Sequence, residues 1–171
     1  MQVNKLMQSL ILVAATGIAA SAGAATTLSK GDQTILADMA QANMGEVAAG
    51  KIALEKSQNA EVKKFAQMMI DDHTTALNSV SEVAKAKEVT LPTDTDATHK
   101  AMAARLSKLS GAEFDKAYMK EAGVADHTKV HAKLKKNETA AKDPDVKGLA
   151  TKLLPTVDNH LQMAKASATA K

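Results

Sequence analysis

Two segments of the chain share one pattern of apolar and polar positions. Residues 61–73 read EVKKFAQMMIDDH, and residues 145–160 read DVKGLATKLLPTVDNH. In both, apolar residues recur three and four positions apart after a Val-Lys pair, which predicts a helix with one buried face. Each segment ends in a histidine, His73 or His160, which lies 11 or 14 residues after the valine. The difference of three is close to one helical turn, so both histidines are predicted to lie on buried faces.

The same periodicity extends over most of the chain and predicts an all-α fold. Short polar links near residues 58 and 142 join long amphipathic segments, which favours two antiparallel helical hairpins packed as a four-helix bundle. A loop with Pro92 separates the hairpins and is followed by one more short helix. The expected helices cover about residues 29–57, 59–87, 97–109, 110–141 and 144–165.

Polar residues are expected at one level of this bundle. Glu46, His73 and His160 each interrupt an apolar stripe, and His127 lies one step beside the stripe of the third long helix. Counted from the hairpin turns at 1.5 Å per residue, their levels differ by less than about 8 Å. A carboxylate at such a position must be paired, hydrogen-bonded or bound to a cation. His131 is a fifth candidate, slightly nearer the turn.

The third long helix is also predicted to have an inward-facing stripe. His127 and Tyr118 lie one position to either side of this stripe. A helical period of 3.6 residues predicts that this stripe consists of Phe114, Ala117, Glu121, Val124, Thr128, His131 and Leu134.

Other titratable residues are expected to lie outside the polar layer. Asp72, Asp126 and Asp158 each stand one or two residues before a candidate histidine. They point about 100–160° away from the inward face, so each is expected at most to hydrogen-bond a ligand from outside. His99 lies on the short connecting helix and is expected to be exposed to solvent.

The first 24 residues have the organisation of a cleaved export signal. Lys5 precedes the apolar run LMQSLILVAATGIA at residues 6–19, and small residues suited to cleavage follow. The run is short for a membrane span, and no second one is present. Residues 25–171 are therefore expected to form a single soluble domain, periplasmic or secreted. The sequence contains no cysteine, so neither a disulfide nor a lipid-bearing N-terminal cysteine is expected.

Charge and aromatic content bear on the class of ligand. The net charge of +3 becomes +2 when Lys5 is removed, and basic residues are spread along the chain. Without a basic patch, nucleic acid is not an expected partner. The sequence has only two phenylalanines and one tyrosine, so few side chains are available to stack on bases, sugars or haem. Neither a protein partner nor an oligomeric state is indicated.

Three separated motifs carry a resemblance to a known family. They are EVKKFAQMMIDDH at 61–73, FDKAYMKEAGVADH at 114–127 and LLPTVDNHLQMA at 153–164. Together with the export signal they resemble the bacterial family called domain of unknown function 4142, often labelled "predicted outer membrane protein". The resemblance covers about residues 32–166 and implies a ferritin-like four-helix bundle. It implies no settled activity.

The resemblance also implies which residues form a site. The positions that match recurring polar residues of the family are Glu46, His73, His127 and His160, with Tyr118 in the motif of the third long helix. Imidazole and carboxylate together suit Zn, Fe, Mn or Cu, and the ligand set alone does not choose among them. A polar layer held by hydrogen bonds, without a metal, is the alternative.

Two cofactors are not expected. A ferritin-type di-iron centre needs Glu-x-x-His on two helices so that carboxylates bridge the metals. In this sequence Ile70, Val124 and Val157 stand three residues before the histidines. Haem would have no Cys-x-x-Cys-His attachment and few aromatic packing partners.

These patterns favour a non-catalytic protein with a metal-binding or envelope-stress role. One alternative is a small metalloenzyme acting on oxygen species, in which Tyr118 is a proton or electron donor near the metal. Another is a structural or partner-binding bundle without a ligand.

Overall fold

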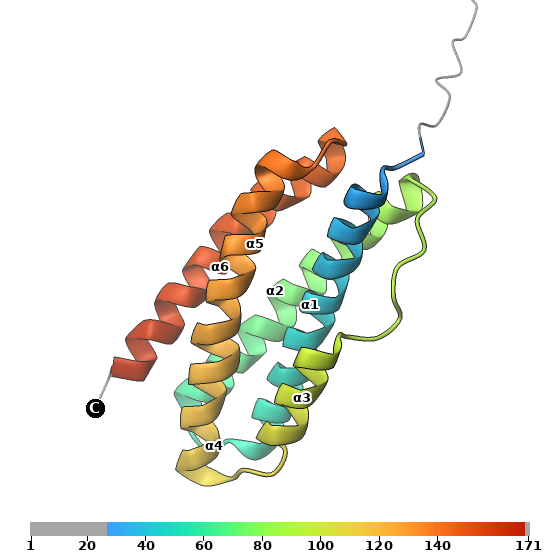
Figure 1. Ribbon diagram of the computed structural model, residues 1–171. Coiled ribbons are helices and arrows are strands. Elements are labelled where there is room, and N and C mark those ends of the chain that lie inside the picture. Colours follow the sequence, from blue (N-terminus) through green and yellow to red (C-terminus); the bar gives the residue numbers. More distant parts are fainter. Residues whose placement is uncertain (1–26, 170–171) are drawn as a thin grey trace, which may run out of the picture.

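Figure 1 shows the computed structural model, which describes residues 27–169. Residues 1–24, interpreted above as an export signal, lie outside the described residues. All regular elements in the described part are helical, which confirms the all-α prediction. They are α1 (Lys30–Lys56), α2 (Ala60–Ala86), α3 (Ala97–Leu106), α4 (Gly111–Tyr118), the π-helix η1 (Met119–Asp126), α5 (His127–Ala140) and α6 (Pro144–Thr169).

The helices form two antiparallel hairpins, α1 with α2 and α5 with α6 (Figure 1). α4, η1 and α5 follow one another without a break and form the third long helix of the bundle. The chain between α2 and α4 returns along α1, so α2 and the third long helix run in the same direction (Figure 1). Thr95 in this connection donates from Oγ1 to the backbone carbonyl of Gln41 on α1 at 2.8 Å. The connection therefore crosses the length of the bundle, a point that the sequence left open.

Polar side chains cap the first two long helices. Ser29 caps α1 by accepting from the backbone N–H of Asp32, and Asn59 caps α2 by accepting from Glu61 and Val62. These caps satisfy N–H groups that have no partner within the helix.

Two side chains of the first hairpin, Asp32 and Lys87, fasten the hairpins together at one end of the bundle. The buried Asp32 carboxylate on α1 accepts from the backbone N–H of Lys142 at 2.9 Å, in the turn between α5 and α6. Lys87, just after α2, pairs with Asp143 at 2.8 Å and with Asp145 at 2.7 Å. The start of α6 is thereby attached to both helices of the first hairpin.

The interior has two apolar clusters with a polar layer between them. One cluster includes Leu36, Val80, Leu134 and Val146, and the other includes Phe65, Met69, Leu106, Phe114 and Tyr118. On each long helix, buried polar residues separate the positions that belong to the two clusters. This layer contains Asn43, Glu46, His73, His99, Asp126, His127 and His160. No helix in the described part of the chain is long and apolar enough to cross a membrane.

The π-helix η1 changes which residues of the third long helix face inward. The predicted stripe was wrong here, since Glu121 pairs with Arg105 at the surface and Thr128 is exposed. A π-helix bonds residue i to i+5, so its turn is wider than the 3.6 residues assumed from the sequence. Buried residues therefore recur in adjacent pairs four positions apart: Tyr118 and Met119, Ala122 and Gly123, Asp126 and His127.

Candidate metal centre

Three histidines from three helices meet inside the bundle. His73 comes from α2, His127 from the start of α5 and His160 from α6, and their exposed fractions are 6%, 1% and 0%. Their ring centroids lie 5.3–5.4 Å apart. One ring nitrogen from each lies within 4.8 Å of the others. We call these residues the three-histidine cluster.

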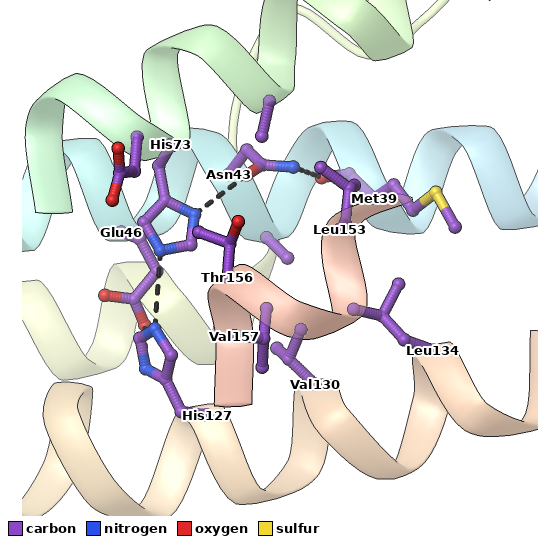
Figure 2. Close-up of a pocket in the computed structure, with 13 residues that line it drawn as sticks. Met39, Asn43, Glu46, His73, His127, Val130, Leu134, Leu153, Thr156 and Val157 are labelled. Atoms are coloured by element: carbon purple, nitrogen blue, oxygen red, sulfur yellow. Dashed lines mark hydrogen bonds and ion pairs between the residues drawn. The ribbon is translucent and has the colours of Figure 1, made fainter. Parts of the chain in front are cut away.

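Asn43 on α1 determines the tautomer of His73. The Asn43 side-chain N–H donates to the backbone carbonyl of Met39 at 2.7 Å, which fixes the orientation of the amide. Its carbonyl oxygen then faces His73 Nδ1 at 2.8 Å (Figure 2). Because that oxygen can only accept, Nδ1 carries the proton. The lone pair of His73 Nε2 is left facing the cluster.

The π-helix determines the tautomer of His127 in the same way. His127 Nδ1 lies 2.8 Å from the backbone carbonyl oxygen of Ala122, five residues earlier, so Nδ1 is again the donor. His127 Nε2 faces His73 Nε2 at 3.3 Å. In the neutral state neither nitrogen can donate to the other. Two ligands about 2.0–2.1 Å from a tetrahedral ion lie about 3.3–3.4 Å apart, so the spacing matches that of metal ligands.

His160 also has one ring nitrogen next to an acceptor and one without a partner, but the roles of Nδ1 and Nε2 are exchanged. Its Nε2 lies 2.8 Å from Oδ2 of Asp72, and its buried Nδ1 has no hydrogen-bond partner. Each histidine of the cluster thus has one nitrogen next to an oxygen acceptor, from an amide, a backbone carbonyl or a carboxylate. Metal-binding histidines nearly always have such an outer partner, which fixes the tautomer and the ring orientation.

The surroundings keep these imidazoles neutral. Burial lowers the pKa of His127 to about 4. Burial, and then the charges of His127 and His160, hold the pKa of His73 well below its usual value. Burial also lowers the pKa of His160, although Asp72 opposes it. A proton shared between His73 and His127 is therefore disfavoured near neutral pH, whereas metal ions require neutral imidazole.

Glu46 lies beside this cluster but is grouped with other residues. Its Oε1 is 3.8 Å from His127 Nδ1, on the side of the ring away from His73. Its carboxyl group lies within 4.8 Å of ligating atoms of His99 and Asp126. Neither Glu46 oxygen has a hydrogen-bond partner, and the residue is only 2% exposed. Burial, and then the charge of Asp126, raise the pKa of Glu46 well above its usual value.

His99 is buried, and the prediction that it is exposed to solvent was wrong. Its Nδ1 lies 2.8 Å from Asp96 Oδ2, and its Nε2 lies 3.2 Å from Asp126 Oδ2. Burial acts to lower the pKa of His99, but Asp126 and Asp96 together raise it above the usual value. The spacing Asp96-x-x-His99 at the start of α3 was a signal for this arrangement, since an N-cap carboxylate can reach a side chain three residues later.

Asp126 is itself 8% exposed and faces the interior, although the sequence placed it outside the polar layer. Only the π-helix brings both Asp126 and the adjacent His127 inward. Asp72 and Asp158 do lie next to histidines, His160 and His131 respectively.

Two further sequence candidates lie apart from the cluster. His131 has a side chain 33% exposed and pairs with Asp158 at 3.1 Å, so the fold does not bring it to the three histidines. Tyr118 is fully buried, stacks on Phe114 with centroids 6.0 Å apart, and meets Phe65 edge-on. Its hydroxyl has no partner, and burial together with the charge of Glu46 raises its pKa well above the usual value.

A cavity of about 30 Å³ opens beside His73 and His127 (Figure 2). Such a volume holds about one water molecule. His73, His127, Glu46 and Asn43 line it on the polar side, and apolar residues including Met39, Val130, Leu134, Leu153 and Val157 line the remainder.

Residues 18–166 match the family described as Domain of unknown function (DUF4142). The chain belongs to this family. Among curated proteins, none matches the DUF4142 chain in sequence.

Solved structures with the same fold come from other proteins. A DUF305 fragment from Deinococcus radiodurans has a TM-score of 0.74 and 14% sequence identity, covering 84% of this chain and 98% of that one. CopM in its Cu(I)-bound form has a TM-score of 0.65 and 15% identity, covering 80% and 94%. CopM in its Cu(II)-bound form has a TM-score of 0.66 and 17% identity, covering 80% and 95%. At these identities the likeness is one of fold.

Proposed function

We propose that this protein binds a copper ion through the three-histidine cluster and serves in metal handling rather than catalysis. The observation that carries the proposal is the pair of facing nitrogens, His73 Nε2 and His127 Nε2, 3.3 Å apart. Both belong to imidazoles whose protons are already engaged on the other side of the ring. Without a cation between them, two buried lone pairs face each other, which is unfavourable. The unpartnered Nδ1 of His160 is the third ligand.

The ligand chemistry supports copper as the ion. Imidazole ligands suit copper and zinc, and Cu(II) binds a given nitrogen site more tightly than the other divalent first-row ions. CopM, which has the same fold, was solved with Cu(I) and with Cu(II). Zinc is the competing ion, because its usual tetrahedral geometry also fits three histidines.

The expected place of action is the cell envelope. Residues 1–24 have the organisation of an export signal, and a bundle released there meets metal ions from outside the cell. N-terminal sequencing of the protein from the periplasm or the medium tests this point. A mature chain that still begins at Met1 contradicts it.

The test of the metal site is a copper competition titration against a chelator of known affinity, using protein purified without a histidine tag. We expect stoichiometric tight binding that falls at least about 100-fold in His73→Ala and in His160→Ala. His131→Ala is the matched control, since it removes a histidine from α5 that lies at the surface. Metal-free protein whose melting temperature is unchanged by copper or zinc would refute the proposal.

The cavity beside the histidines favours one second candidate function. Three protein ligands with space for a water molecule are typical of catalytic metal sites, because the fourth position can hold a substrate. A copper enzyme acting on a small oxygen species fits a cavity of about 30 Å³. Consumption of superoxide or peroxide by the copper-loaded protein, lost in His73→Ala, distinguishes this candidate from a copper carrier.

A further inference from the structure

We propose a second cation site, formed by Glu46, His99 and Asp126 and adjacent to the three-histidine cluster. Ligating atoms of these three buried residues lie within 4.8 Å of one another. They come from α1, α3 and η1, so only the folded chain assembles them. The site does not use the histidines of the first cluster, and it stands or falls independently of the copper proposal.

The unpartnered oxygens of Glu46 are the first reason to infer a cation here. Both carboxyl oxygens are buried without a hydrogen-bond partner, in a residue 2% exposed. A carboxylate in that position costs several kcal/mol unless a partner compensates for the lost water. No lysine or arginine is among the buried polar residues of the described chain. A bound dication supplies the missing partner.

A glycine on α1 makes room for the His99 imidazole. Gly45 precedes Glu46 on α1, and a Cβ at that position would lie 2.3 Å from His99 Cδ2. Only glycine allows the imidazole to approach α1 this closely, although glycine inside a helix is unfavourable by about 1 kcal/mol relative to alanine. This close approach accompanies the placement of a His99 ring nitrogen within 4.8 Å of a Glu46 carboxyl oxygen.

Asp96 orients that imidazole toward Asp126. One Asp96 oxygen caps α3 by accepting from the backbone N–H of Thr98 and of His99, and the other accepts from His99 Nδ1 at 2.8 Å. His99 Nε2 then points at Asp126 Oδ2, 3.2 Å away. This distance is close to the spacing of about 3.3 Å between two ligands of one tetrahedral ion. A carboxylate behind a ligating histidine is also a common feature of metal sites.

The ligand types define the class of ion. Two carboxylates and one imidazole suit a divalent first-row cation that accepts both oxygen and nitrogen, such as zinc, manganese or iron. The charge of a dication balances the two carboxylates that bind it. This differs from a ferritin-type centre, because the carboxylates are on α1 and η1 and the histidine is on the crossing helix α3. The competing occupants are protons: one on Glu46, whose carboxyl group would then donate to Asp126, and one on His99, shared with Asp126 and Asp96.

Counting bound zinc tests the proposal, because zinc accepts both imidazole and carboxylate. The full protein, without a histidine tag, is stripped with a chelator and titrated with zinc; bound metal is then measured by mass spectrometry. We expect two equivalents for the wild type and one for Glu46→Gln, for Asp126→Asn and for His73→Ala. Glu46→Gln keeps the size and neutrality of a protonated carboxyl group, so we expect it to fold. Asp115→Asn is the matched control, since Asp115 has a buried unpartnered oxygen elsewhere, on α4.

The outcomes separate the two sites. One equivalent that is lost in His73→Ala and kept in both Glu46→Gln and Asp126→Asn overturns the second site. One equivalent kept in His73→Ala and lost in Glu46→Gln supports the second site and shows that the three-histidine cluster takes no zinc, while the copper proposal is decided by its own copper titration. Circular dichroism of each metal-free variant verifies its helix content.

Tyrosine fluorescence provides a second readout. Tyr118 is the only tyrosine and the chain has no tryptophan, so Tyr118 emission reports directly on binding beside Glu46. Quenching by Co²⁺ in His73→Ala but not in the double variant with Glu46→Gln supports the site, and equal quenching in both opposes it.

Discussion

His73 Nε2 and His127 Nε2 face each other at 3.3 Å, although the two residues are 54 positions apart in the chain. The other nitrogen of each ring faces an acceptor, Asn43 Oδ1 at 2.8 Å and the Ala122 carbonyl at 2.8 Å. The backbone and a fixed amide thus orient both lone pairs toward one point. If the proposed copper ion binds at that point, its ligands are already held in position by the surrounding shell.

The neutral histidines make the stability of the metal-free protein depend on pH. Burial lowers the pKa of His127 to about 4, whereas an unfolded histidine titrates near 6.5. Between these values the unfolded state binds more protons, so the free energy of unfolding falls as pH falls from 6.5 to 4. The loss from His127 is about 3 kcal/mol. Urea unfolding at several pH values measures it. His127→Gln should flatten the slope, and a slope equal to that of the wild type would contradict the assignment.

Asp72 and Asp158 provide a matched pair of carboxylates. Asp72 Oδ2 holds buried His160 through Nε2 at 2.8 Å, whereas Asp158 pairs with the partly exposed His131 at 3.1 Å. Loss of an outer partner of a metal ligand typically costs 10- to 100-fold in affinity, so we expect about that effect for Asp72→Ala. Asp158→Ala should leave copper affinity unchanged. The same chelator competition measures both variants, and equal affinities would show that Asp72 does not position His160.

Alanine substitutions at Gly45 and Gly148 test how closely His99 approaches α1. A Cβ at Gly45 would lie 2.3 Å from His99 Cδ2, and one at Gly148 on α6 would meet nothing within 4 Å. Overpacking a tight site costs about 1–3 kcal/mol, so Gly45→Ala should lower the free energy of unfolding by about that amount. Gly148→Ala should raise it by about 0.5–1 kcal/mol, since alanine favours a helix over glycine. Urea denaturation compares them. A stabilised Gly45→Ala protein would mean that His99 does not occupy this position.

Tyr118 carries a buried hydroxyl without a partner. Removing an unsatisfied buried polar group recovers its desolvation cost, about 1–3 kcal/mol. Tyr118→Phe keeps the stacking on Phe114 and the edge contact with Phe65, so we expect the metal-free protein to gain about 1 kcal/mol. Thermal and urea unfolding provide the measurement. A loss of stability instead would indicate that the hydroxyl donates a hydrogen bond in solution.

The sequence predicted the bundle and most of its boundaries because these depend on local rules. α2 begins directly after the predicted link near residue 58, and the apolar stripes of α2 and α6 are buried from Val62 to Val80 and from Val146 to Val157. It failed on the third long helix, where η1 turns Glu121 outward and brings Asp126 inward. A fixed 3.6-residue period cannot anticipate a π-helix, because the wider turn is stabilised by packing against other helices.

The sequence by itself determined the helices, their two hairpins and the level at which Glu46, His73, His127 and His160 lie, since periodicity, caps and residue counts are properties of one helix at a time. Only the tertiary structure decided which of these residues meet. The connection between α2 and α4 places His99 next to Glu46, and η1 turns Asp126 toward both. The three histidines of the cluster meet on the opposite side of the His127 ring. Such groupings depend on helix rotation and on contacts between distant segments, and neither is encoded in the spacing along a single helix.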